Sequence, residues 1–175
     1  MSIFIVDVEA DGQCPGINNM VWIGAVKVDS KLDQTFEGKL KPMYPKCDTS
    51  DDALAVSGLK YEDTLEFPDP KETMLEFFQW IQTVSKGRPI LYSDNNGFDF
   101  GYINYYFWYH LNQNPFGWTS RNINSMWHGI QKDCYSSFKF LRKTKHTHNP
   151  VDDAMGNAEA LWAMKEKYGL KINLK

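Results

Sequence analysis

The sequence predicts an α/β protein in which helices cover both faces of one sheet. Strand-like runs come first along the chain, and strand-like and helical segments then alternate, which is typical of such layered proteins. The first run is apolar on both of its faces, as in a central strand that is buried on both sides. With 42% hydrophobic and 23% charged residues among 175, and no repeat or linker, the composition predicts one folded domain over residues 1–175 and excludes a disordered chain.

Three strands are expected in the first quarter of the chain. Residues 3–9 form the doubly apolar run, and the polar stretch 13–19, with its Pro-Gly pair, predicts a loop. Residues 20–28 and 34–40 are the next two strands, because the polar segment 29–33 between them is typical of a hairpin connection.

Helical signals dominate the remainder. A short helix is expected at 49–58, and residues 70–84 carry Met74, Phe77, Phe78 and Ile81 at helix spacing. A short strand at 89–93 precedes helices at about 97–111 and 122–131. A last helix is expected to begin at Asn149-Pro150, because Asn caps a helix and Pro suits its first position.

Charge and cysteine content narrow the class of protein. The formal net charge of −3 excludes a strongly basic nucleic-acid coat protein, although residues 136–148 carry four basic residues and no acid. That basic segment is either a contact for phosphates or a solvated face. No apolar run approaches the ~20 residues that span a bilayer, and from the first residues we expect no secretory signal. Three widely spaced cysteines favour a reducing compartment, so we expect a cytoplasmic protein without membrane association.

Two acids interrupt the first strand. Asp7 and Glu9 alternate with Val8 and therefore share a face with Ile3 and Ile5, at the carboxyl end of the strand. Two buried and uncompensated carboxylates would be costly, and a bound divalent cation would remove that cost. The alternative is that the strand has ended by Asp7 and that both acids are solvated.

A third acid, Asp99, falls on the expected buried face of the helix at 97–111. It shares that face with Tyr102, Ile103 and Tyr106. Its alternative role is an acid in the first turn that interacts with the helix dipole. The nearby Asp94 has a sufficient explanation as a turn or capping residue.

The last helix brings a fourth acid. Asp152 falls where it can complete a capping box with Asn149, which leaves Asp153 without a structural role. His148 lies just before the helix and is expected close to Asp153, whereas His146 is expected at the surface. Four carboxylates and one His, without thiolates, favour Mg²⁺ or Mn²⁺ over Zn²⁺, and can hold two such ions.

Three motifs in order resemble those of the DEDDh exonucleases, which include polymerase proofreading domains, RNase T and oligoribonuclease. They are D-V-E at 7–9, N-x-x-F-D at 95–99 and H-x-x-x-x-D at 148–153. The flanking sequence at 53–59 and 145–153 is similar to small bacterial and phage stand-alone exonucleases. Ala10-Asp11-Gly12 replaces the T-T-G of many proofreading domains, which leaves the substrate subclass open.

This resemblance implies a ribonuclease H-like fold with a five-stranded mixed sheet. It further implies two Mg²⁺ or Mn²⁺ ions and 3′-to-5′ release of nucleoside monophosphates from single-stranded DNA or RNA. On this basis Asp7, Glu9, Asp99 and Asp153 are the expected metal ligands and His148 the general base.

The substrate is expected to be a single-stranded nucleic acid with a free 3′ end. Candidate contacts with it are Asn95, the backbone of Val8 and Ala10, and the side chains of Phe98 and Leu59, the last two with core packing as the alternative. A homodimer is a further expectation from the family. Three other functions stay open: a non-catalytic interaction module on the same fold, a proofreading subunit that acts only beside a polymerase, and a hydrolase of small nucleotides rather than polymers.

Overall fold

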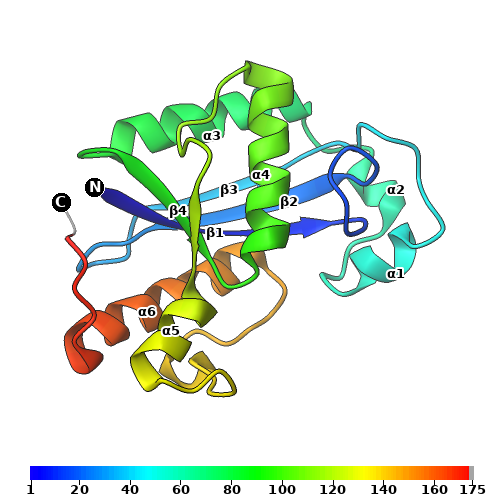
Figure 1. The fold of residues 1–175 in the computed structure, drawn as a ribbon. Helices are drawn as coiled ribbons and strands as arrows, with labels where there is room; N and C mark the ends of the chain where they lie inside the picture. Colours follow the sequence, from blue (N-terminus) through cyan, green and yellow to red (C-terminus); the bar gives the residue numbers. More distant parts are fainter. Residues whose placement is uncertain (174–175) are drawn as a thin grey trace.

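A computed structural model describes residues 1–173 and contains a five-stranded mixed sheet in the order β3-β2-β1-β4-β5 (Figure 1). β1 pairs antiparallel with β2 and parallel with β4, while β2–β3 is antiparallel and β4–β5 is parallel. This architecture confirms the predicted α/β class and the mixed sheet. The strands are β1 (Ser2–Ala10), β2 (Met20–Lys27), β3 (Thr35–Lys39), β4 (Pro89–Ser93) and β5 (Ser120–Asn122).

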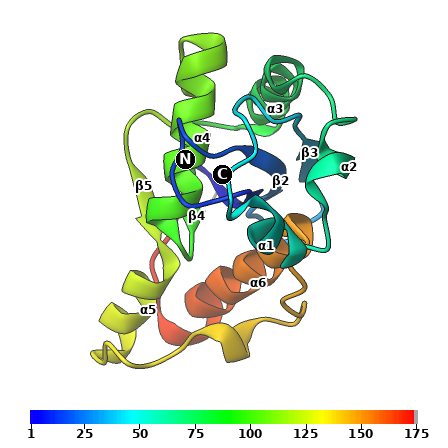
Figure 2. The ribbon, with the colours of Figure 1, turned by 90° about the vertical axis from the view of Figure 1, so that its right-hand side faces the viewer.

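Helices cover both faces of this sheet. In Figure 1, α3 and α4 lie on one side of the strands and α5 and α6 on the other. The short α1 and α2 lie beyond the end of the sheet where β1 finishes, the end that faces the viewer in Figure 2. The helices are α1 (Ser50–Ala55), α2 (Tyr61–Thr64), α3 (Pro70–Val84), α4 (Asn96–Leu111), α5 (Ile123–Gln131) and α6 (Pro150–Tyr168), with a 3₁₀ turn η1 at Lys139–Leu141.

β1 is the central strand, and it separates two apolar cores. Phe4, Val6 and Val8 belong to the core under α3 and α4. Ile3 and Ile5 belong to the core under α5 and α6. The predicted doubly buried strand is therefore confirmed, and Asp7 and Glu9 emerge on the α6 side of the sheet.

Three short elements were not expected from the sequence. β5 has three residues, none of them apolar, and α2 and η1 have four and three residues. Segments of this length carry too few residues to show a periodicity.

Among residues 1–173, none of the helices combines the length and apolar character that crossing a membrane requires.

One close backbone contact determines where α6 begins. Gly24 pairs with Asp7 across β1 and β2, and a Cβ at Gly24 would lie 2.1 Å from the carbonyl carbon of Pro150. Only a glycine leaves room for the first turn of α6 at this point of the sheet. The contact therefore places the start of α6 directly beside Asp7.

The start of α6 is capped as expected, with one difference. The Asn149 side chain accepts hydrogen bonds from the backbone N–H groups of Val151 and Asp152. The predicted capping box is wrong, because the Asp152 carboxylate accepts from the Thr147 hydroxyl and the same hydroxyl accepts from the Asn149 N–H. Asp152 thus ties the preceding loop to the helix.

Candidate active site

Two groups of carboxylates meet where β1 ends. Asp7, Asp94 and Asp99 form one group, and Asp7, Glu9 and Asp153 form the other; within each group one ligand oxygen per residue lies within 4.8 Å of the others. Asp7 is a member of both groups. The structure therefore brings together the four acids predicted from the sequence and adds Asp94 to them.

Asp99 is held by the strand that it faces. It is 2% exposed, and its Oδ1 accepts a hydrogen bond of 3.2 Å from the backbone N–H of Val8. Within residues 1–173, its Oδ2 is buried without a hydrogen-bond partner. A buried carboxylate oxygen without a donor is costly unless it is protonated or binds a cation, so this atom is a candidate metal ligand.

Burial and mutual repulsion raise the pKa values of these acids. Burial, followed by the charges of Asp99 and Asp94, raises the pKa of Asp7 well above its usual range. Burial and Asp94 raise the pKa of Asp99 in the same way. Burial and Asp153 raise the pKa of Glu9 to about 7. Clustered carboxylates with perturbed pKa values are typical of functional sites, which makes these acids the candidate active site.

Asp94 is the site residue that sequence reasoning missed. Instead of capping α4, its carboxylate lies 3.0 Å from Nη2 of Arg142 and accepts a hydrogen bond of 3.2 Å from the amide of Asn157. Asn157 also contacts Arg142 and is fully buried. Arg142 was expected on a basic segment that is solvated or binds phosphates, yet its side chain is only 6% exposed. One sign of this role is visible in the sequence: Asp94 is an acid directly before the motif residue Asn95.

The loop before α6 carries both histidines of the site. Asp153 is 2% exposed and accepts hydrogen bonds from the backbone N–H groups of Thr147 and His148. The prediction that His146 lies at the surface is confirmed, because its side chain is 47% exposed, but its Nδ1 also lies 2.7 Å from Oδ1 of Asp153. The His148 ring lies beside the His146 ring, with the two centroids 4.2 Å apart.

A small cavity of about 510 Å³ is lined by Gln13, Asn95, Gly97 and Phe98, of which the last three belong to the segment between Asp94 and Asp99. Asn95 is exposed there, and the partly buried Phe98 ring packs edge-on against Tyr102 at 5.1 Å. Two of the predicted nucleic-acid contacts, Asn95 and Phe98, therefore line one hollow.

The other predicted contacts have different surroundings. The backbone N–H of Val8 is used by Asp99, so it is not free for a nucleotide. Ala10 lies after a register irregularity in β1 and pairs with Met20. Leu59 packs against the small core of Val21, Trp22 and Leu54.

Asp11, which follows the D-V-E motif, has a structural role of its own. Its buried carboxylate accepts hydrogen bonds from the backbone and side-chain N–H groups of Asn19, at 2.6 and 2.7 Å, and from the Ser50 hydroxyl at 3.2 Å. These bonds tie the loop after β1 to the start of α1.

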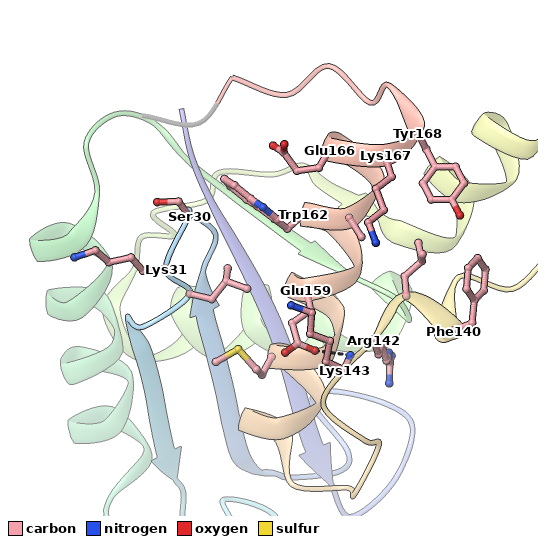
Figure 3. A pocket seen from close by; sticks show the side chains of 14 residues that line it. Ser30, Lys31, Phe140, Arg142, Lys143, Glu159, Trp162, Glu166, Lys167 and Tyr168 are labelled. Carbon is pink, nitrogen blue, oxygen red and sulfur yellow. Dashed lines mark hydrogen bonds between the residues drawn. The ribbon is translucent and has the colours of Figure 1, made fainter.

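A larger cavity lies along the outer face of α6, away from these acids. Its volume is about 830 Å³, and its walls include Leu32, Phe140 and Trp162 together with charged side chains such as Lys143 and Glu159 (Figure 3). Its lining includes none of the four predicted metal-binding acids and neither of the two histidines. The candidate active site is therefore the end of the sheet and not the larger hollow.

The donor set fits divalent cations that prefer oxygen. Both acidic groups consist only of carboxylates, which are typical ligands of Mg²⁺ and Mn²⁺. Two adjacent cations could both bind the shared Asp7, and one of them could bind the unpartnered oxygen of Asp99.

Comparison with known proteins identifies the family of this chain. The sequence matches the model of the RNase T exonuclease family over residues 4–172. It is 33% identical over 163 residues to the 3′-5′ DNA exonuclease Cap18 of Escherichia coli, with 91% of this chain and 84% of that protein covered.

Solved structures share the fold at low sequence identity. The nuclease domain of 3′hExo, a DEDDh family member bound to rAMP, superposes with a TM-score of 0.72 at 17% identity, covering 99% of this chain and 96% of that one. E. coli Exonuclease I in complex with a dT13 oligonucleotide gives a TM-score of 0.71 at 14% identity, covering 95% of this chain and 41% of that one. These neighbours confirm the ribonuclease H-like fold, and the family as a whole uses divalent metal ions. The family match over residues 4–172 and the Cap18 relative show that this chain belongs to the RNase T family of DEDDh 3′-5′ exonucleases.

Proposed function

We propose that the protein removes nucleoside monophosphates from the 3′ end of single-stranded nucleic acid, with two Mg²⁺ or Mn²⁺ ions held by Asp7, Glu9, Asp99 and Asp153. The observation that carries this proposal is the pair of carboxylate groups that share Asp7. When bound, two such ions stabilise the charge that develops on the attacking and leaving oxygens of a phosphodiester. Residues 1–175 act as one catalytic domain.

His148 is proposed as the general base. It lies in the loop whose backbone N–H groups donate to Asp153, and it is partly buried beside that carboxylate. An imidazole titrates near neutral pH and is suited to accept the proton of an attacking water. The hydrogen bonds to Asp153 fix the loop and so hold the His148 ring at the acidic groups.

The cavity lined by Asn95 and Phe98 is proposed to hold the terminal nucleotide. Its aromatic wall can stack on a base, and the Asn95 amide can hydrogen-bond to it. The low overall charge supports few phosphate contacts, and therefore a short strand or the frayed end of a longer one. We propose DNA as the preferred polymer, because the 33%-identical relative carries the name of a DNA exonuclease.

Two competing functions make different predictions. A non-catalytic module would have no need of four acids and a His at one site, so the intact set of motif residues opposes it. A proofreading subunit would hydrolyse DNA only in complex with a polymerase.

Homodimer formation and a cytoplasmic location stay predictions from the sequence.

The deciding experiment is hydrolysis of matched 5′-labelled single-stranded DNA and RNA oligomers by the purified protein with Mg²⁺ or Mn²⁺. A descending ladder that EDTA and the Asp7→Asn variant both abolish supports the proposal, and the faster ladder identifies the sugar. Intact oligomers under all conditions would overturn it.

A further inference from the structure

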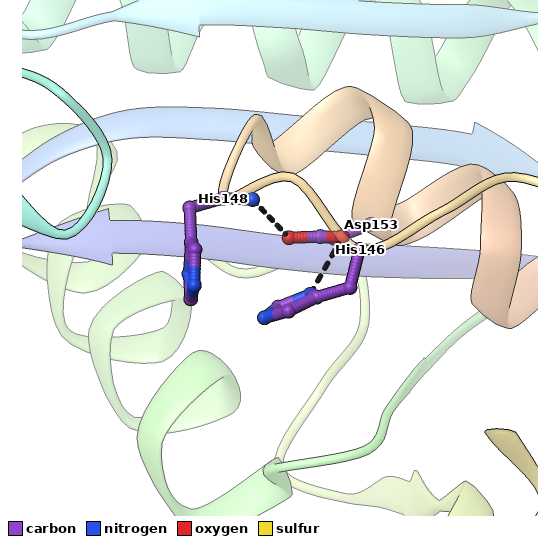
Figure 4. Close-up of side chains that lie close together, drawn as sticks. All are labelled: His146, His148 and Asp153. Atoms are coloured by element: carbon purple, nitrogen blue, oxygen red, sulfur yellow. Dashed lines mark hydrogen bonds and ion pairs between the residues drawn. The ribbon is translucent and has the colours of Figure 1, made fainter.

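His146, His148 and Asp153 form a third group of metal-binding side chains, chemically different from the two acidic groups. One donor atom of each lies within 4.8 Å of the others. His146 Nδ1 is 2.7 Å from Asp153 Oδ1, and the two imidazole centroids are 4.2 Å apart. Figure 4 shows the His146 ring directed toward the ring of His148, below the Asp153 carboxylate.

The backbone brings these rings together. His148 has a φ of +60°, in the left-handed region that a non-glycine residue rarely adopts. This turn lets the N–H groups of residues 147 and 148 bind the Asp153 carboxylate, whose Oδ1 also lies next to the His146 ring. His146 and His148, two residues apart in sequence, therefore face one carboxylate.

Two imidazoles and one carboxylate are a donor set that favours Zn²⁺ over Mg²⁺. Zinc binds nitrogen ligands readily, and three protein ligands with one open position form a common zinc geometry. His146 is 47% exposed, so an ion can reach the group from solvent and retain a water as its fourth ligand.

We propose that His146, His148 and Asp153 form an inhibitory site for Zn²⁺ or a similar transition-metal ion. The inhibitory part rests on the proposed function, because a bound Zn²⁺ would occupy the proposed base His148 and the proposed ligand Asp153 together. His146 is the residue that adds this sensitivity to the site, since it belongs to neither acidic group.

Binding can be tested without measuring hydrolysis. Zn²⁺ is titrated into the protein with a chromophoric chelator as competitor, at one fixed Mg²⁺ concentration, so that competition for the shared Asp153 is the same in every variant. We expect one Zn²⁺ to bind, with affinity at least tenfold weaker in His146→Ala and in His148→Ala. The matched control is His128→Ala, since His128 lies on α5 and bonds to the carbonyl of Ser136. Equal affinity in His146→Ala and the unmodified protein would overturn the site.

Inhibition is tested on Mg²⁺-supported hydrolysis, with each variant compared with its own rate without zinc. We expect the Zn²⁺ concentration for half-inhibition to rise at least tenfold in His146→Ala and to stay unchanged in His128→Ala. Zinc that binds through His146 but inhibits both proteins equally would refute the inhibitory role. If no protein hydrolyses any oligomer, the proposed function fails, while the binding titration still decides the zinc site.

Discussion

Arg142 forms an ion pair with Asp94, with 3.0 Å between Nη2 and Oδ2, and this pair joins two parts of the active site. Asp94 directly follows β4 and precedes α4, which carries Asp99. Arg142 belongs to the segment that leads to His148. The guanidinium also lies over the Phe138 ring, 5.5 Å from its centroid, and the aliphatic part of the Arg142 side chain lies against Gly156, where an added Cβ would be 3.1 Å from Arg142 Cδ. The pair thus fixes the distance between the loop of His148 and the acids of β1 and α4.

Replacing Arg142 by Gln is expected to lower the free energy of unfolding by roughly 3 kcal/mol, because it leaves Asp94 uncompensated beside other acids. Urea unfolding measures the loss. The double variant Arg142→Gln/Asp94→Asn should recover part of it, which gives the coupling energy of the pair. The exposed Lys143→Gln is the control, with a change within about 0.5 kcal/mol. A loss that the double variant does not reduce would refute the coupling.

Asp7→Asn is expected to abolish hydrolysis and to raise the melting temperature of the metal-free protein. The variant removes a charge that burial and the neighbouring acids disfavour, as the raised pKa of Asp7 indicates. Thermal unfolding in EDTA and the oligomer assay measure the two effects. Asp48→Asn, at an exposed position, is the control that should change neither. An active Asp7→Asn protein would exclude the proposed metal site.

His148→Ala is expected to lower turnover by about 10² to 10⁴ while Mn²⁺ binding stays intact, since a general base contributes that much and no ligand is lost. Single-turnover hydrolysis and Mn²⁺ binding followed by electron paramagnetic resonance measure the two quantities. If Mn²⁺ binding disappears together with activity, His148 acts as a ligand instead. His128→Ala serves again as the control.

The metal-free protein is expected to lose stability as pH rises through the range in which Glu9 ionises. The pKa of Glu9 is about 7 in the folded protein and near its ordinary 4.5 when unfolded, so the folded state binds the proton more tightly. Stability from this group is therefore present below about pH 4.5 and is lost by about pH 7. In denaturant unfolding with EDTA, the free energy of unfolding of Glu9→Gln should increase relative to that of the unmodified protein as pH rises across this interval. A difference between the two proteins that does not vary with pH would contradict the prediction.

Gly24→Ala is expected to displace the start of α6 and to weaken the metal site. The added Cβ would lie 2.1 Å from a backbone atom of Pro150, and overpacking of this kind costs about 1–3 kcal/mol. Because Asp153 follows in the same first turn, Mn²⁺ affinity and turnover should fall together with stability. Gly129→Ala in α5, where a Cβ meets nothing within 4 Å, is the control. A Gly24→Ala protein with unchanged Mn²⁺ affinity would show that α6 adapts without moving Asp153.

Much of the fold followed from local patterns. Pro70–Val84 is a helix over the predicted residues, and α6 begins at the predicted Asn149-Pro150 cap. β5 escaped prediction because Ser120–Asn122 has three polar residues whose strand structure depends on pairing with β4. Strands of this kind are determined by their neighbours and carry no periodicity of their own.

The sequence by itself determined that Asp7, Glu9, Asp99 and Asp153 belong together, because each acid lies on an otherwise apolar face or lacks a structural role. Only the tertiary structure decided that Asp94, Arg142 and Asn157 form a buried network behind them, and that His146 reaches Asp153. The physical reason is that an acid on an apolar face is anomalous within its own segment. A polar residue in a loop is ordinary, and its role depends on partners far away along the chain, here 48 residues for Asp94 and Arg142.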